Sequence, residues 1–194
     1  LARFEPDMFG RRFARAHPAR ARIGLLLRHR RVEAAALDRN AARPQSIASL
    51  ESAFPAVRAH EFAVLQHATS ATAKEWPEND WVRVGEYLAA LGLTSVVPFG
   101  NAEERERSER LAARIPGARV PPALDLDQLA ALMSRARIVI GVDTGLTHLA
   151  AALGRATIGL YRATDPAATG LYGSSRALNL GGIGMSPSSA EVAG

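Results

Sequence analysis

The chain has 194 residues, 47% of them hydrophobic, which is enough for one full domain and part of another but hardly for two. It contains no cysteine, which excludes a disulfide framework, a thiolate metal site and a cysteine nucleophile. No apolar run reaches the roughly 18 residues that a membrane-spanning helix needs, and the first residues lack the apolar centre of a signal peptide. The absence of cysteine suits a cytoplasmic protein.

The formal net charge of +5 is divided unevenly along the chain. Residues 1–60 hold twelve arginines against five acidic residues, whereas residues 61–194 hold eleven arginines and one lysine against fourteen. A basic segment such as residues 1–60 is typical of an arm that binds nucleic acid or a membrane surface. We favour a plain Arg-rich segment of uncertain order and expect no nucleic-acid partner, because the arginines form no helical stripe and few aromatics lie among them. Within it, residues 23–27 and 32–37 predict a short strand and a short helix.

A strand and an amphipathic helix are predicted where the less basic part begins. The apolar run Phe62–Leu65 ends in a polar stretch, which is typical of a strand followed by a loop. The helix begins at Trp76-Pro77-Glu78, because proline suits the first helical position and acidic side chains suit the positive end of the helix dipole. It ends before Gly92. Its apolar face is formed by Trp81, Val84, Leu88 and Leu91.

Strands and helices continue to alternate up to residue 161. The predicted elements are strand 95–99, helix 102–114, helix 126–136 with Asp125 as its cap, strand 138–142, helix 145–153 and strand 157–161. This alternation predicts βαβ units and a mostly parallel sheet. Strand 138–142 is apolar throughout, as expected of a central strand buried on both faces. The sequence therefore predicts an α/β fold with a Rossmann-like parallel sheet in a domain that covers residues 61–194.

Polar residues follow three of the predicted strands. They are Thr69, Ser70 and Lys74 after the first strand, Glu103 and Glu104 after the second, and Asp143 to His148 after strand 138–142. Parallel sheets bind ligands at the carboxyl ends of their strands, where backbone N–H groups of helix N-termini attract anions. A nucleotide pocket needs cations and N–H groups to bind phosphate, together with an acidic side chain to bind ribose.

Lys74 is the only lysine among 24 basic residues. A chain that uses arginine almost everywhere has kept a lysine in a loop predicted to bind phosphate. A compact ammonium group can approach a phosphate where the planar guanidinium group of arginine does not fit. Chance survival of one surface lysine explains the same observation equally well.

The triplet Asp143-Thr144-Gly145 after an apolar strand also occurs in aspartic proteases. That chemistry needs two carboxylates that share a proton, in an all-β fold or a homodimer, whereas here the triplet leads into a helix and has no second copy. Another interpretation is that Asp143 or Thr144 caps this helix while His148 packs beneath it. We expect the cap to form and His148, four residues beyond Thr144 on the same face, to contact the ligand.

Several motifs between residues 61 and 186 occur together in one known family. They are the run from Gly141 to Leu153, Leu160-Tyr161, Thr164-Asp165-Pro166, His67-Ala68-Thr69-Ser70, Lys74, Trp76-Pro77-Glu78 and Gly170-Leu171-Tyr172-Gly173. This combination resembles glycosyltransferase family 9. Thr164-Asp165-Pro166 favours the type I lipopolysaccharide heptosyltransferases of the family over type II. The resemblance covers about two-thirds of the chain.

The resemblance implies a GT-B fold, in which the C-terminal Rossmann-like domain binds ADP-heptose and the N-terminal one binds Kdo-lipid A. The implied enzyme acts in the cytoplasm, peripherally on the inner face of the bacterial inner membrane, in lipopolysaccharide inner-core biosynthesis. It transfers heptose from ADP-heptose to the Kdo of Kdo-lipid A by an inverting displacement that needs no metal or cofactor. A carboxylate of the N-terminal domain is the expected general base, so no catalytic base is identified in this chain.

The resemblance also implies roles for individual residues. Thr69, Ser70 and Lys74 would contact the phosphates or sugar of the donor, and Lys74 would stabilise the leaving group. Glu104 would face the adenosine ribose, with Glu103 as the alternative. The remaining donor-binding residues are Asp143 for the heptose hydroxyls and Thr144, Gly145 and His148 for the diphosphate.

The chain departs from the family pattern in three places. Residues 1–60 show no recognisable Gly-rich acceptor domain and are interpreted as its remnant or a linker. Arg162-Ala163 stands where Gly-Pro is expected, and the chain stops soon after Ser186-Pro187, where the family has a closing helix that packs back on the first domain. The alternative to an active enzyme is therefore a non-catalytic ADP-sugar-binding fragment that lacks the acceptor domain.

Overall fold

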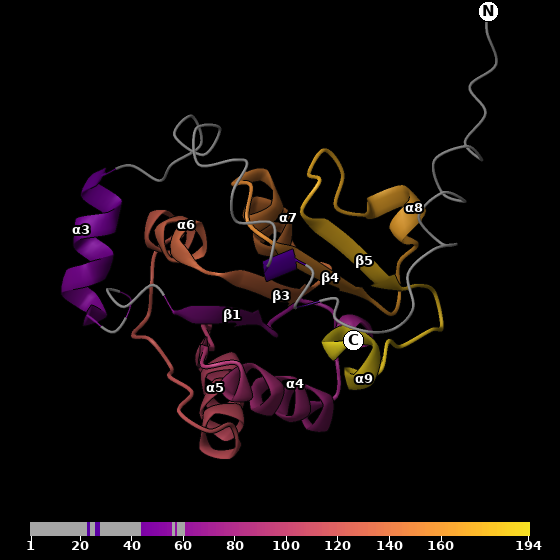
Figure 1. Ribbon diagram of the computed structural model, residues 1–194, viewed down its shortest axis with the longest axis horizontal. Helices are drawn as coiled ribbons and strands as arrows, with labels where there is room; N and C mark the ends of the chain where they lie inside the picture. The colour runs from indigo at the N-terminus through magenta and orange to yellow at the C-terminus, as the bar shows by residue number, and fades with distance from the viewer. Residues whose placement is uncertain (1–22, 24–25, 28–43, 56, 58–60) are drawn as a thin grey trace, which may run out of the picture.

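The computed structural model describes residues 23, 26–27, 44–55, 57 and 61–194. These residues form a parallel sheet of five strands in the order β2-β1-β3-β4-β5, flanked by helices on both faces (Figure 1). The strands are β1 (Phe62–Gln66), β2 (Thr94–Val96), β3 (Ile138–Val142), β4 (Thr157–Tyr161) and β5 (Ala177–Gly181). The α/β fold with a Rossmann-like parallel sheet, predicted from the alternation of strands and helices, is confirmed.

The helices cover the two faces of the sheet. On one face lie α3 (Pro44–Ala53), α6 (Leu126–Arg135) and α7 (Gly145–Ala152), and on the other lie α4 (Glu78–Ala90), α5 (Ala102–Arg114) and α9 (Ser189–Ala193) (Figure 1). The short helix α8 (Pro166–Thr169) follows β4, and the 3-10 turn η3 (Thr72–Lys74) follows β1. No helix of the described residues is long and apolar enough to cross a bilayer.

Side chains at the helix ends explain where several helices begin. The Asn101 side chain accepts a hydrogen bond from the Glu104 N–H and caps α5. Asp125 and Gln128 form a reciprocal capping box at α6, which confirms Asp125 as the cap. Glu78 and Asp80 lie in the first turn of α4, as predicted, although Pro77 occupies the N-cap rather than the first helical position.

Two apolar clusters hold the helices on the sheet. One includes Leu65, Trp81 and Leu88 and packs beneath α4, α5 and α9. The other includes Val64 and Val139 and packs beneath α3, α6 and α7. Residues before the predicted domain boundary at residue 61 also take part, because Ile23 and Leu26 belong to the first cluster and Leu50 and Val57 to the second.

Three predictions differ from the structure. Ile23, Leu26 and Leu27 are helical rather than extended, because apolar residues three and four apart share one face of a helix. Strand β2 ends at Val96 instead of residue 99, since Pro98 has no N–H to donate to the sheet. Leu91 is 46% exposed, beyond the last turn of α4. The segments α3, α8, β5 and α9 were not predicted, and the helix predicted at 32–37 lies outside the described residues.

The order of the strands creates a switch point between β1 and β3. The connection from β1 passes through α4 to β2 on one side, whereas β3 connects through α7 to β4 on the other side. Adjacent parallel strands whose connections diverge leave a crevice beyond their carboxyl ends, and ligands of open α/β sheets bind there. The loops that follow β1 and β3 therefore meet where a ligand is expected.

Candidate functional site

A cleft of about 730 Å³ lies at this switch point. One part of its wall is polar, and another is formed by apolar side chains of α6, α7 and the segment after β2. The polar part comprises Gln66, Thr69, Ser70, Lys74, Glu104, Asp143 and Thr144, and the apolar part comprises Pro98, Phe99, Leu126, Leu129, Leu146 and Leu149. The cleft thus combines charged groups with a surface suited to a planar apolar group.

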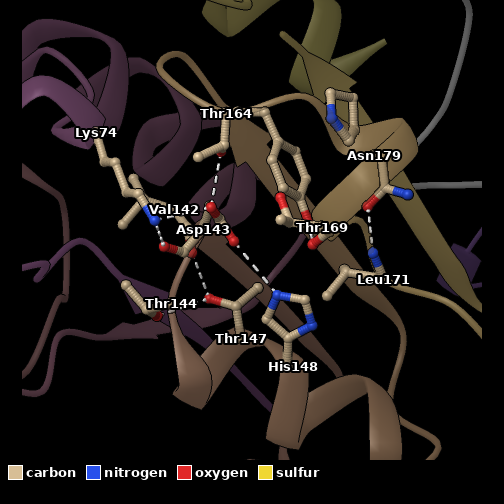
Figure 2. Close-up of polar contacts among 12 residues, drawn as sticks. Lys74, Val142, Asp143, Thr144, Thr147, His148, Thr164, Thr169, Leu171 and Asn179 are labelled. Carbon is tan, nitrogen blue, oxygen red and sulfur yellow. Dashed lines mark hydrogen bonds and ion pairs between the residues drawn. The ribbon is translucent and has the colours of Figure 1, made fainter. Parts of the chain in front are cut away.

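Asp143, directly after β3, is the centre of the polar contacts (Figure 2). Its Oδ2 accepts hydrogen bonds from Lys74 Nζ at 2.9 Å and from Thr164 Oγ1 at 2.7 Å. Its Oδ1 lies 3.3 Å from His148 Nε2, which must carry the hydrogen if it donates to a carboxylate. Two segments distant in sequence, which carry Lys74 and Thr164, therefore converge with the first turn of α7 on one carboxylate.

The surroundings of Asp143 favour its ionised form. Burial by itself would raise the pKa of this carboxyl, since its side chain is only 7% exposed. The hydrogen bonds from Lys74, Thr164 and His148 and the charge of Lys74 outweigh burial, and the pKa of Asp143 is lowered from its ordinary value. Asp143 is therefore negatively charged at neutral pH and acts as an acceptor only.

Lys74 is held over the cleft by the turn η3. Its ammonium group donates to Oδ2 of Asp143 and also approaches the Asp143 backbone oxygen at 3.3 Å. An ammonium group has three N–H donors, so one remains for a ligand oxygen. The side chain is 28% exposed, which leaves this group accessible from the cleft.

The N-terminus of α7 is built without a side-chain cap. Thr144 occupies the N-cap position, but its side chain makes no capping hydrogen bond, and Asp143 is committed to the contacts above. The prediction that Asp143 or Thr144 caps this helix is therefore wrong. The Thr147 hydroxyl donates to the Val142 oxygen at 2.7 Å, so the Thr144 hydroxyl must be the donor in its 3.3 Å contact with Thr147.

A glycine is required beneath this helix start. A Cβ added at Gly141 would lie 2.2 Å from the Thr147 hydroxyl oxygen, a contact that side chains do not make. Glycine therefore lets α7 approach β3 closely, and the backbone N–H groups of its first turn face the end of the strand. Such N–H groups attract anions.

The other predicted site residues take up distinct positions. Thr69, Ser70, Glu104 and Gly145 line the same cleft as Lys74, Asp143 and Thr144. His148 does not line it but contacts Asp143 from α7 with a side chain that is 41% exposed. The Glu104 carboxylate accepts a hydrogen bond from the Gly100 N–H at 2.7 Å. Glu103, the alternative to Glu104, lines only a neighbouring cavity.

That neighbouring cavity has a volume of about 570 Å³ and lies between the loop after β1 and α5. Arg107 pairs with Glu75 and Arg110 with Glu78 in its wall. His67 is fully buried there and contacts the Ser108 hydroxyl at 2.7 Å. Burial, and then the charges of Arg107 and Arg110, lower the pKa of His67 to about 4, so this histidine is neutral at neutral pH.

The contacts of Asp143 decide against the aspartic-protease interpretation. Among the described residues its partners are Lys74, Thr164 and His148, and none is a second carboxylate that could share a proton. The parallel α/β sheet is also the wrong fold for that chemistry. In the part of the chain that the structure describes, no three histidine or acidic side chains gather closely enough to hold a metal ion.

The sequence predictions assigned no role to three residues of this region. Thr164 reaches Asp143 from the segment after β4, and only its place in Thr164-Asp165-Pro166 could have indicated it. Arg162 donates to the Glu75 backbone oxygen and so connects the segment after β4 with the loop that carries Lys74. Gln66, the last residue of β1, lines the cleft although it lies in an apolar strand.

Comparisons with known proteins agree with this geometry. The family model described as glycosyltransferase family 9 (heptosyltransferase) matches residues 13–192. Lipopolysaccharide heptosyltransferase 1 of Pseudomonas aeruginosa is 43% identical over 115 residues, which make up 59% of this chain and 32% of that protein. The chain thus spans about a third of the length of this curated relative.

Two solved structures are similar to the described fold. E. coli heptosyltransferase WaaC with ADP has a TM-score of 0.64 and 35% identity, covering 68% of this chain and 42% of that one. E. coli heptosyltransferase WaaC with ADP-2-deoxy-2-fluoro heptose has a TM-score of 0.62 and 36% identity, covering 68% and 41%. The similarity thus extends to proteins with a nucleotide or a nucleotide sugar bound.

Proposed function

Because the chain belongs to glycosyltransferase family 9, we propose that it binds ADP-heptose in the cleft between β1 and β3 and serves in heptosyl transfer to Kdo-lipid A. The observation that carries this proposal is the ion pair of Lys74 with Asp143 at the switch point of the sheet. It brings a cation for phosphate and an acceptor for sugar hydroxyls to one place. The relatives with ADP or an ADP-sugar analogue bound support a nucleotide-sugar donor.

The diphosphate of the donor binds at the start of α7. The backbone N–H groups of Gly145 and its neighbour have no side-chain cap and can donate to phosphate oxygens. Lys74 contributes its third N–H and a positive charge, and His148, on the first turn of the helix, contacts Asp143 beside this site. Thr144, Thr69 and Ser70 supply hydroxyl groups along the same wall.

The two sugars and the base take the remaining parts of the cleft. Asp143 accepts hydrogen bonds from heptose hydroxyls, for which its low pKa keeps it ionised. Glu104 accepts from the hydroxyls of the ribose, because its carboxylate is fixed by the Gly100 N–H and lines the cleft. Adenine lies on the apolar wall formed by α6 and α7.

The reaction is an inverting displacement at the anomeric carbon of heptose. An acceptor hydroxyl of Kdo attacks this carbon while the bond to the ADP oxygen breaks, and a carboxylate from the acceptor-binding domain takes the hydroxyl proton. Lys74 and the N-terminus of α7 stabilise the negative charge that develops on ADP, so charge stabilisation does not call for a metal ion. Since Kdo-lipid A resides in a membrane, the transfer takes place at the cytoplasmic face of the inner membrane.

Calorimetric titration with ADP and ADP-heptose tests the donor site. We expect saturable binding of both ligands to the parent chain. Lys74→Ala should lose about tenfold or more in affinity for both, because Lys74 contacts the diphosphate, whereas Asp143→Asn should lose as much for ADP-heptose but not for ADP, because Asp143 contacts the heptose hydroxyls. Arg83→Ala is the matched control, because Arg83 is an exposed cation on α4 that lines neither cavity. Absence of ADP binding in the parent, or equal affinity in all variants, would contradict the proposal.

A further inference from the structure

Gln66 ends strand β1 with a buried carboxamide. Its side chain is only 4% exposed, and its Cα is in register with Gly141 of β3. Phe62 and Val64 of the same strand pack in the cluster beneath α6 and α7. Because side chains alternate along a strand, Gln66 faces the same side of the sheet, towards the apolar wall of the cleft.

The carboxamide oxygen of Gln66 has no hydrogen-bond partner. Oε1 is buried and unpaired within the part of the chain that the structure describes, although the residue lines the cleft. A buried acceptor without a partner destabilises a fold, so natural structures pair such groups with protein, water or ligand. Ser95 on β2 also has an unpaired buried oxygen, but it lines neither cavity.

The surroundings of Gln66 indicate what kind of group would pair with it. The charged groups of the cleft, Lys74 and Asp143, contact each other across the ends of β1 and β3. On the face towards which Gln66 points, α6 and α7 contribute Leu129, Leu146 and Leu149. A neutral amide beside apolar side chains suits a planar neutral group with both donors and acceptors on its edge better than a phosphate or a free sugar.

We propose that Gln66 determines base specificity by pairing its carboxamide with the amino-bearing edge of adenine in the bound nucleotide. A carboxamide offers an acceptor beside a donor, and adenine offers an amino donor beside a ring-nitrogen acceptor, so the two groups can form paired hydrogen bonds. A half-turn of the amide about its terminal bond brings either atom towards the cleft. This inference rests on the proposed binding of ADP and adds to it the residue that reads the base.

The test compares ligands that differ only in this edge. Purine riboside 5′-diphosphate lacks the amino group of ADP, and pyrophosphate lacks the base altogether. We expect the parent chain to bind ADP about five- to tenfold more tightly than purine riboside 5′-diphosphate, which is the range of one to two hydrogen bonds. Gln66→Leu, which keeps the size of the side chain, should lose this preference and bind pyrophosphate as the parent does.

A control variant and an NMR measurement on the parent chain separate the possible outcomes. Ser95→Ala removes an unpaired buried oxygen outside the cleft and should leave the preference for ADP unchanged. In the parent chain, ADP should shift the NMR signals of the Gln66 side-chain amide, a measurement that requires no substitution. If the parent binds ADP and Gln66→Leu keeps the same preference, or the amide signals do not move, the inference is wrong while the proposed donor site stands. If the parent does not bind ADP, both fail.

Discussion

Lys74 and Asp143 form a 2.9 Å ion pair across 69 positions of sequence. Lys74 lies shortly after β1, and Asp143 directly follows β3. These two strands are neighbours in the sheet. The contact therefore depends on the strand order, which places the two loops at one switch point. Thr164 and His148 complete the set of groups around the carboxylate.

The low pKa of Asp143 predicts a pH-dependent contribution to stability. Its pKa in the folded chain lies below the ordinary value of 3.8, so the unfolded chain takes up this proton first as the pH falls. The stabilisation is fully present above pH 3.8 and is lost as the pH drops towards the folded pKa. Urea unfolding of the parent and of Asp143→Asn should show that the parent loses stability relative to the variant only in this acidic range. If the difference in free energy of unfolding between parent and variant stays constant down to pH 3, the lowered pKa of Asp143 is contradicted.

His67 should remain neutral far below the ordinary pKa of histidine. Its pKa is lowered to about 4 from 6.5, so protonation of the unfolded chain destabilises the fold between these two pH values, by up to roughly 3 kcal/mol. The hydrogen on Nε2 is expected to be donated to Ser108, whose hydroxyl lies 3.4 Å from the Pro98 oxygen that it can bond in turn. Histidine 15N NMR should show this tautomer at pH 6. A charged His67 at that pH would refute it.

Arg162 is predicted to position the loop that carries Lys74. Its guanidinium group donates to the backbone oxygen of Glu75, the residue after Lys74, while Thr164 two positions further on donates to Asp143. Arg162→Gly, which restores the glycine expected from the family pattern, should weaken ADP binding by about threefold to tenfold, the range of one hydrogen bond. Arg162→Lys should retain part of the affinity. Unchanged ADP affinity in the glycine variant would show that the contact does not position Lys74.

Asp125 should contribute to stability through the capping box of α6. Asp125→Ala removes the acceptor for the Gln128 N–H and should lower the free energy of unfolding by about 1 kcal/mol. Asp125→Asn and Asp125→Ser keep a capping oxygen and should cost a few tenths of that amount at most. Denaturant unfolding with an unchanged slope measures the difference. Equal stability of Asp125→Ala and the parent would contradict the role of the cap.

The central strands could be predicted because their residues leave few alternatives. Strand β3 is apolar at every position and buried at every position, as a strand covered on both faces must be. Strand β5 was not predicted because Asn179 and Gly181 are poor strand formers. In addition, β5 lies at the edge of the described sheet, and most of its residues are only partly buried. Helix α9 carries a signal that was available, the Ser188–Glu191 capping box.

The sequence predicted which residues line the candidate site, but not which of them contact each other. Lys74 and Asp143 were predicted as site residues because both lie in loops that follow strands. Such loops meet at the carboxyl edge of a parallel sheet. Their ion pair depends on the strand order, which a single sequence does not reveal. The side-chain cap expected at α7 failed because the Asp143 carboxylate has stronger partners than the helix N–H groups, namely Lys74 and Thr164.

The most direct test of the donor site is an ADP titration of the 15N-labelled chain followed by backbone amide NMR. We expect saturable shifts that are largest at Thr69, Gly145 and Leu146, which line the cleft between β1 and β3. Lys74→Ala should weaken these shifts without moving them elsewhere. Shifts confined to the neighbouring cavity around Glu78 and Arg110, or none at saturating ADP, would contradict the assignment of this cleft as the nucleotide site.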